Sequence, residues 1–278
     1  MLKLLTILLS ILFTANSVCF SQPSADEWID TCYSSSGADK ITFDALKDSL
    51  GESSCEAVFQ KAMTVGAINL NKYEIKTLEP IEVFSHVKWL FIEDNQISDL
   101  SPISSFKDLT KLRAGGNRIK QLEPLNELVN LEELNLEKNR IECINPLENL
   151  GELVSLDLEK NRIIDVDAVA YLVNLKELRL SFNPIKSIEC SNLVNLKTLS
   201  LRQTKIKEFN SISTLTDLSE LYLGEQLLPE IALKKLQDQI SYSLINGNLA
   251  FLRDLKNLST LSLAIEQMRE YVAFRNAQ

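Results

Sequence analysis

The sequence predicts an elongated α/β solenoid, in which short parallel strands line the concave face of a curved stack of coils. Two observations carry this prediction. An 11-residue pattern returns eight times between Val65 and Leu228, at intervals of 22 residues with a single interval of 21. Within each copy, apolar residues alternate, as at Leu134 and Leu136, which is the period of a strand with one buried face. One coil cannot bury such a face alone, so the coils must stack.

The repeated pattern also explains how each coil leaves its strand and returns. The eight copies read VGAINLNKYEI, VKWLFIEDNQI, LTKLRAGGNRI, LEELNLEKNRI, LVSLDLEKNRI, LKELRLSFNPI, LKTLSLRQTKI and LSELYLGEQLL. The recurring Asn follows the strand (Asn95, Asn117, Asn139, Asn161, Asn183). A buried amide there can donate to carbonyl groups of one coil and accept from N–H groups of another, so we expect stacked copies to satisfy one another. Beyond it, apolar residues at three-residue steps, as from Ile141 to Leu150, favour a 3₁₀ or irregular return segment.

The form L-x-x-L-x-L-x-x-N-x-I is the signature of leucine-rich repeats. Residues 65–228 resemble the 22-residue class found in bacterial, exported internalins and in eukaryotic phosphatase regulators, and the segments LEPLNELVNL and INPLENLGEL match that class. The resemblance implies a leucine-rich repeat horseshoe with a cap at each end. Tyr73, Thr204 and Gln226 replace the Asn, and Ala114 replaces a strand leucine. The first and last of these departures lie in edge coils, which are expected to be atypical.

Residues 1–21 read as a secretory signal peptide. Lys3 supplies the positive start, residues 4–13 supply the apolar core, and small residues follow. Cleavage after Ser21 and cleavage after Ser17 both fit, and an uncleaved anchor or a lipid anchor through Cys19 are the competing interpretations. We therefore expect export to the periplasm, the cell surface or the medium, with no membrane span after cleavage.

Residues 22–64 are predicted to form a helical amino-terminal cap. Ser24 and Ser53 each precede a glutamate by three residues, which is the spacing of a capping box. Thr42 is predicted to begin a third helix, which Gly51 ends. Such a cap resembles that of internalins, which looks like a degenerate EF-hand. If Gly37 were the central glycine of a calcium loop, the ligand positions would carry no carboxylates, so no metal is expected.

Four cysteines remain after the signal peptide, and an even number in an exported protein favours disulfides. Cys32 and Cys55 both lie in the cap, where a bridge could contribute ~3 kcal/mol through loop entropy. Cys143 and Cys190 occupy different positions in coils two repeats apart, which is too distant for a bridge. We predict a Cys32–Cys55 disulfide and two half-buried free thiols.

Residues 229–278 are predicted to form an irregular carboxyl-terminal cap. Residues 229–240 read as a helix that begins with Pro229 in its first turn. Leu258, Leu261 and Leu263 then recover the strand spacing once more. We interpret this segment as helices and one degenerate coil that close the far end of the stack.

No catalytic or cofactor site assembles in the sequence. The one histidine, His86, lies at a coil junction without a nucleophile motif and is interpreted as a surface residue. No Cys or His pair has zinc spacing, and no phosphate-binding loop or dinucleotide motif is present. The formal charge of −9 gives a nucleic-acid partner no electrostatic support. We expect neither an enzyme nor a cofactor.

Two columns of outward-facing side chains are predicted on the concave face, because the non-leucine strand positions point away from the core and stack about 5 Å apart. One column reads Asn69, Phe91, Arg113, Asn135, Asp157, Arg179, Ser200 and Tyr222. Its neighbour reads Ala67, Trp89, Lys111, Glu133, Ser155, Glu177, Thr198 and Glu220.

Aromatic and arginine side chains are the usual anchors of protein interfaces, because they bury much area with limited entropy loss. Trp89 and Phe91 give the strongest indication, since an apolar pair on this face has no core to enter; the alternative is that both seal the junction with the cap. The candidate partner-binding residues are Trp89, Phe91, Arg113, Asp157, Arg179, Phe182 and Tyr222.

A third column consists of Arg118, Arg140 and Arg162, beside Glu137 and Glu159. Pairing of these opposite charges, worth at most ~1 kcal/mol for each pair, is the favoured interpretation. The sequence as a whole predicts an exported monomer that binds an unidentified protein partner on its concave face. The alternative is a structural or adhesive element of the cell envelope without a dedicated concave ligand.

Overall fold

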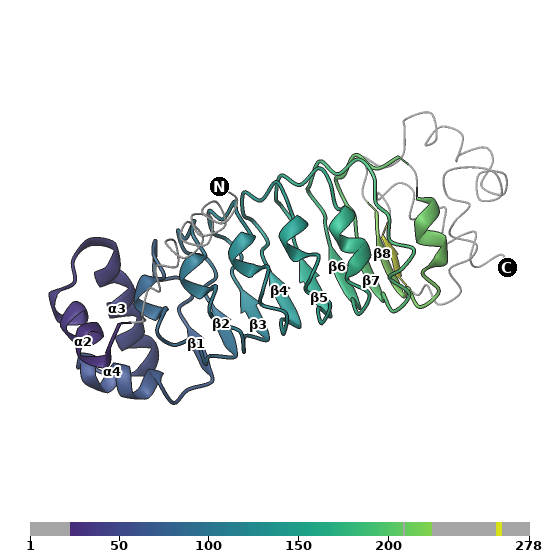
Figure 1. Cartoon of the computed structure of the whole chain (residues 1–278). Coiled ribbons are helices and arrows are strands. Elements are labelled where there is room, and N and C mark those ends of the chain that lie inside the picture. The colour runs from purple at the N-terminus through teal and green to yellow at the C-terminus, as the bar shows by residue number, and fades with distance from the viewer. Residues whose placement is uncertain (1–22, 208, 224–259, 263–278) are drawn as a thin grey trace, which may run out of the picture.

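The computed structural model describes residues 23–207, 209–223 and 260–262, and it confirms the predicted solenoid (Figure 1). Three-residue strands form one open parallel sheet in chain order, from β1 to β9. The strands are β1 (Ala67–Asn69), β2 (Trp89–Phe91), β3 (Lys111–Arg113), β4 (Glu133–Asn135), β5 (Ser155–Asp157), β6 (Glu177–Arg179), β7 (Thr198–Ser200), β8 (Glu220–Tyr222) and β9 (Thr260–Ser262). The predicted signal peptide, residues 1–21, lies outside the described residues.

Short 3₁₀ helices occupy the return segments of most coils, as the three-residue apolar steps indicate. They are η1 (Glu79–Ile81), η2 (Ser101–Ile103), η3 (Glu123–Leu125), η4 (Asn145–Leu147), η5 (Asp167–Tyr171) and η6 (Asn210–Thr214). The coil between β6 and β7, which is the one with 21 residues, contains no such helix.

The predicted carboxyl-terminal cap, residues 229–278, lies outside the described residues except for β9. This strand pairs in parallel with β8, and Leu221 is opposite Leu261. The strand spacing that returns around Leu261 therefore does correspond to a strand of the same sheet.

Each strand from β1 to β8 buries its middle residue, and the residues on both sides of it belong to the concave face. Leu90, Leu112 and Leu134 are buried and lie opposite one another in consecutive strands. The register pairs Trp89 with Lys111 and Phe91 with Arg113. The observed register therefore lines up the residues of the two predicted columns.

A ladder of buried asparagines joins successive coils. The Oδ1 atom of Asn139 accepts from the N–H of Ile119 in the preceding coil at 3.0 Å. Its Nδ2 atom donates to the carbonyl of Ala114 in that coil at 2.9 Å and to the carbonyl of Leu136 in its own coil at 3.0 Å. Asn95, Asn117, Asn161 and Asn183 make equivalent bonds. The predicted exchange of hydrogen bonds between coils is confirmed.

The residue before this position takes a left-handed conformation in every coil from the first to the seventh. The φ angles lie between 54° and 69° at Lys72, Asp94, Gly116, Lys138, Lys160, Phe182 and Gln203. The backbone N–H still bonds to the next coil, for example from Lys138 to the carbonyl of Glu159 at 2.8 Å. The turn is thus fixed on both sides, which offsets the cost of about 1–2 kcal/mol for a side chain in this region.

The amino-terminal cap consists of α2 (Ala25–Ser34), α3 (Gly37–Leu50) and α4 (Cys55–Ala62), at one end of the stack (Figure 1). Trp28, only 3% exposed, packs edge-on against Phe43 and Phe84 with ring centroids 5.0 and 5.5 Å away. Its indole N–H donates to the carbonyl of Pro80 at 2.7 Å. This aromatic cluster joins the cap to the first coil, with Phe59 as its fourth member.

Two predicted helix starts in the cap are wrong, while two other cap signals are confirmed. Ser24 caps α2, and Gly51, with φ of 70°, ends α3. The cap of α4 is Ser54 rather than Ser53, because the hydroxyl of Ser54 accepts from the N–H of Ala57. Thr42 lies inside α3, where its buried hydroxyl donates to the carbonyl of Thr77 at 2.9 Å and ties the helix to the first coil.

The predicted disulfide is present between Cys32 and Cys55, across 23 residues of sequence, and it joins α2 to α4. Cys143 and Cys190 are free, as predicted, but neither is half-buried. Cys143 is exposed, and Cys190 is buried in the shortened coil, where it takes a core position. Burial raises the pKa of the Cys190 thiol to about 11, so this thiol is unreactive at neutral pH.

The asparagine ladder predicts a large loss of stability for Asn139→Ala. The substitution leaves the N–H of Ile119 without its acceptor inside the stack, which costs about 1–3 kcal/mol for a buried group. It also removes one of the two amide donors to the carbonyls of Ala114 and Leu136. We expect the free energy of unfolding in urea to fall by about 3 kcal/mol. The control is Asn130→Ala, which removes an exposed asparagine whose Nδ2 atom donates to the carbonyl of Lys107. Equal losses in the two variants would contradict a special role for the buried ladder.

Candidate functional site

The predicted partner-binding residues form two groups along the concave face. We call Trp89, Phe91 and Arg113, on β2 and β3, the first cluster. We call Asp157, Arg179, Phe182 and Tyr222, on or just after β5, β6 and β8, the second cluster. Coil four separates the two clusters and contributes Glu133, Asn135 and Glu137 to the same face.

Trp89 dominates the first cluster because half of its side chain, 51%, is exposed to solvent. The amino group of Lys111 lies 5.8 Å from the centre of its ring, and the same amino group pairs with Glu133 at 2.7 Å. The cap is sealed by Trp28 and its phenylalanines instead, so the alternative interpretation, in which Trp89 seals the cap, does not hold. Phe91 is half-buried beside exposed Arg113.

Phe182 stands out in the second cluster because it combines exposure with an unfavourable backbone. It is 45% exposed and has a φ angle of 61°, which bulky side chains rarely adopt. The amino group of Lys160 in the preceding coil lies 5.5 Å from the centre of its ring. The Asn ladder and the αL turn hold the ring at the rim of the concave face.

Arg179 and Tyr222 complete the second cluster through contacts with acidic and basic neighbours. The Nε atom of Arg179 donates to Glu177 at 2.6 Å. The guanidinium of Arg202 lies 5.0 Å from the ring of Tyr222, whose hydroxyl donates to Glu220 at 3.0 Å. Burial and the bond to Glu220 raise the pKa of Tyr222.

Arg202 was not among the predicted site residues. Arg202 lies two residues beyond its strand, at the position that Glu137 and Glu159 hold in their own coils. The geometry of the turn brings this position over the concave face.

Ser200 was predicted to point into the concave face, but it is buried, with 5% exposed. Its hydroxyl lies 2.6 Å from that of Ser181 and donates to Glu159, two coils away in the chain, at 3.0 Å. Two small side chains on neighbouring coils let the longer Glu159 fold over them.

Asp157 carries the largest shift in pKa of the concave carboxylates, to about 6. Burial of the carboxyl group is the main cause, and the charges of Glu159 and Glu137 add to it. The backbone N–H of Glu159, which donates to Oδ1 at 3.0 Å, and the charge of Arg179 oppose the shift. The centre of the face thus holds a carboxyl group that titrates close to neutral pH.

Arg118, Arg140 and Arg162 do not pair with Glu137 and Glu159 as predicted. Glu137 pairs with Lys138 and Lys160, at 3.2 Å each. Arg162 lies 3.9 Å from Glu142, and Arg118 and Arg140 have no ion pair among the described residues. The reason is geometric, because the αL turn separates the arginines from the concave carboxylates and brings the lysines to them.

The described part of the chain contains no cluster of His, Cys, Asp and Glu side chains that could hold a metal ion. His86, predicted as a surface residue, is half-buried, and its Nε2 atom is enclosed without a hydrogen-bond partner. No helix within the described ranges is long and apolar enough to cross a membrane.

Comparisons with known sequences agree with the repeat pattern. The family described as Leucine Rich repeats (2 copies) matches residues 107–149, and the family described as Leucine Rich Repeat matches residues 174–196. No curated protein matches the chain. These matches show leucine-rich repeats in the two segments, and the stacked sheet and the Asn ladder give the described residues a leucine-rich repeat fold.

Solved structures of bacterial proteins share the fold. An internalin C2 from Listeria monocytogenes has a TM-score of 0.66 and 25% identity, over 79% of this chain and 91% of its own. An internalin, InlF, from the same organism has a TM-score of 0.66 and 21% identity, over 89% of this chain and 79% of its own. A leucine-rich repeat protein from Leptospira interrogans has a TM-score of 0.52 and 22% identity, over 78% and 60%. The similarity between this chain and these three structures lies in the fold.

The raised pKa of Asp157 predicts that Asp157→Asn stabilises the protein above pH 6. The folded state binds more protons than the unfolded state between about pH 4 and pH 6, so stability falls as pH rises through this window and stays low above it. Asn69 and Asn135 show that asparagine makes the same bond to the N–H two residues on. We expect a gain of about 2 kcal/mol in urea unfolding at pH 7.5 and little gain at pH 4.

Asp165→Asn is the matched control, because Asp165 is exposed and accepts the same kind of bond from the N–H of Asp167. A gain for Asp157→Asn that did not change between pH 7.5 and pH 4 would contradict the proposed cause.

Proposed function

We propose that the protein is exported and binds another protein on its concave face through the two clusters. One observation carries the proposal: Trp89 and Phe182 expose about half of their side chains on a rigid face where neither has a core to enter. Leucine-rich repeat proteins serve protein–protein interaction in general, which supports a role of this kind for the exposed rings. The named partner-binding residues are part of the proposal.

The exposed aromatic rings are suited to be anchors because their backbones are already fixed. Trp89 lies on β2, which pairs with a strand on each side, and Phe182 lies in a turn that bonds to the coils on both sides. Fixed anchors lose little conformational entropy when a partner covers them, so most of the burial energy remains available for affinity. The cations over both rings can also stay in place when the partner binds.

The charge of the face indicates the chemistry of the partner. The same face carries the carboxylates of Glu133, Asp157, Glu159 and Glu177, of which Glu133 and Glu177 already pair with cations of the chain. A partner that brings apolar residues to Trp89 and Phe182 and a basic residue to Asp157 would fit the face. Such a contact would lower the pKa of Asp157 and keep it charged in the complex.

Export is supported by two independent features of the amino-terminal region. Residues 1–21 have the composition of a signal peptide. The Cys32–Cys55 bridge belongs to an oxidising compartment, because disulfides are rare in proteins that stay in the cytosol.

The double variant Trp89→Ser and Phe182→Lys tests the proposal without disturbing the fold. Ser155 and Lys160 occupy the same positions in coil five, and lysine already takes the αL angle there. We expect the variant to unfold at the same temperature as the unmodified chain and to lose at least roughly tenfold in affinity for a partner captured from the cell envelope or medium.

Tyr171→Ser is the control, because Tyr171 is 64% exposed but lies at the end of η5, away from the sheet. A partner that is retained equally by all three proteins would refute binding through the two clusters.

A further inference from the structure

A row of basic side chains follows the edge where each coil leaves the sheet. The row occupies the two positions that flank the buried isoleucine after the Asn, and all its members are exposed. We call it the basic ridge: Arg118, Lys120, Arg140, Arg162, Lys186, Lys205 and Lys207. Of the ten such positions in coils three to seven, one alone carries a carboxylate, Glu142. This concentration of positive charge stands on a chain whose formal charge is −9.

The basic ridge has a fixed spacing, because backbone hydrogen bonds join its coils. The N–H of Arg118 donates to the carbonyl of Ile97 at 2.8 Å, and Arg140 and Arg162 repeat this bond at 2.9 Å each. Lys205 repeats it at 2.8 Å. One coil therefore advances the charges by roughly 5 Å, the distance between neighbouring strands. The result is a row of cations on a rigid support.

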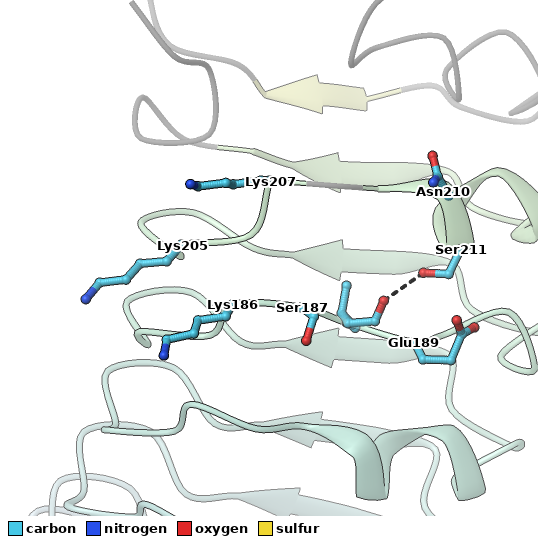
Figure 2. Close-up of a pocket in the computed structure, with 8 residues that line it drawn as sticks. Lys186, Ser187, Glu189, Lys205, Lys207, Asn210 and Ser211 are labelled. Carbon is cyan, nitrogen blue, oxygen red and sulfur yellow. Dashed lines mark hydrogen bonds between the residues drawn. The ribbon is translucent and has the colours of Figure 1, made fainter.

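The ridge ends in a recess of about 740 Å³ between coils six and seven. Lys186, Lys205 and Lys207 lie on one side of it, and Glu189 lies at the opposite end (Figure 2). Ser187, Asn210 and Ser211 contribute hydroxyl and amide groups to its lining. No ion pair neutralises the three lysines within the described part of the chain.

Glu189 does not act as their counter-ion, because its carboxylate is used locally. It accepts from the backbone N–H of Ser191 at 3.0 Å and from the hydroxyl of the same residue. These two bonds lower the pKa of Glu189. The recess thus combines a cationic side with a polar floor.

A second recess shows that the lysines, and not the coil geometry, distinguish the first. It lies at the same place between coils two and three and has a volume of about 540 Å³. Its lining includes Asp99 and Glu123 and no lysine. The stack therefore forms such hollows by itself, and of these two hollows the one at the end of the ridge has three lysines.

We propose that the basic ridge and its recess bind a linear anionic polysaccharide, with sulfate or carboxylate groups on the ridge and one sugar unit in the recess. Cations repeated along a line suit a polymer whose anions repeat along its length. Hydroxyl and amide groups beside the lysines suit a sugar ring better than a bare anion. The lining has no aromatic side chain on which a nucleic-acid base would stack. This surface is separate from the concave face and does not depend on the proposed function.

The test compares two triple variants of the full chain with the same change in charge. Lys186→Glu, Lys205→Glu and Lys207→Glu reverse the recess. Lys88→Glu, Lys176→Glu and Lys197→Glu reverse three exposed lysines that precede the strands and have no ion pair among the described residues. Binding of fluorescent heparin is measured at 0.15 M salt, with dextran, single-stranded DNA and phosphatidylglycerol vesicles as the other probes, and thermal unfolding confirms that each variant is folded.

We expect heparin to bind the unmodified chain and the second variant alike, and to bind the recess variant roughly tenfold to a hundredfold more weakly. Dextran should not bind, and DNA and vesicles should bind more weakly than heparin. The proposal is overturned if heparin does not bind, if both variants lose affinity equally, or if DNA or vesicles bind as tightly as heparin.

Discussion

The ladder of buried asparagines is the constraint on which the rest of the structure depends. Each side chain closes the turn of its own coil and also bonds to the backbone of the preceding coil. Asn139, for example, accepts from the N–H of Ile119 and donates to the carbonyls of Ala114 and Leu136. A strand of three residues supplies few ladder bonds, so the asparagines determine where one coil lies on the next. The leucine interior then fills the space that this register defines.

The fixed register gives one stack two surfaces of opposite chemistry. The strands present aromatic residues and carboxylates on the concave face, whereas the segment after each turn presents arginine and lysine along the edge. The αL residue separates the two surfaces, since it reverses the chain directly before the Asn. It also brings Lys138 and Lys160 over Glu137, and Arg118 and Arg140 have no ion pair among the described residues.

The period of the sequence was enough to predict the fold, the register and the exchange of bonds by the asparagines, because all three follow from stacking identical units. Individual partners could not be predicted in this way. Thr42 and Ser54 depend on how α3 and α4 meet the first coil, and Ser200 depends on a glutamate two coils away. The free Arg118 and the stacked Arg202 depend on the direction of a turn that the pattern does not reveal. The predicted caps and signal peptide lie partly or wholly outside the described residues.

Amide hydrogen exchange of the free protein tests this account most directly. The N–H groups of Ile97, Ile119, Ile141 and Ile163 each donate to an asparagine side chain of the next coil. If the ladder holds the coils in register, these four amides exchange as slowly as those of the buried strand residues. If they exchange as fast as exposed amides of the return segments, the coils are not locked, and neither surface is the rigid support that binding at either one requires.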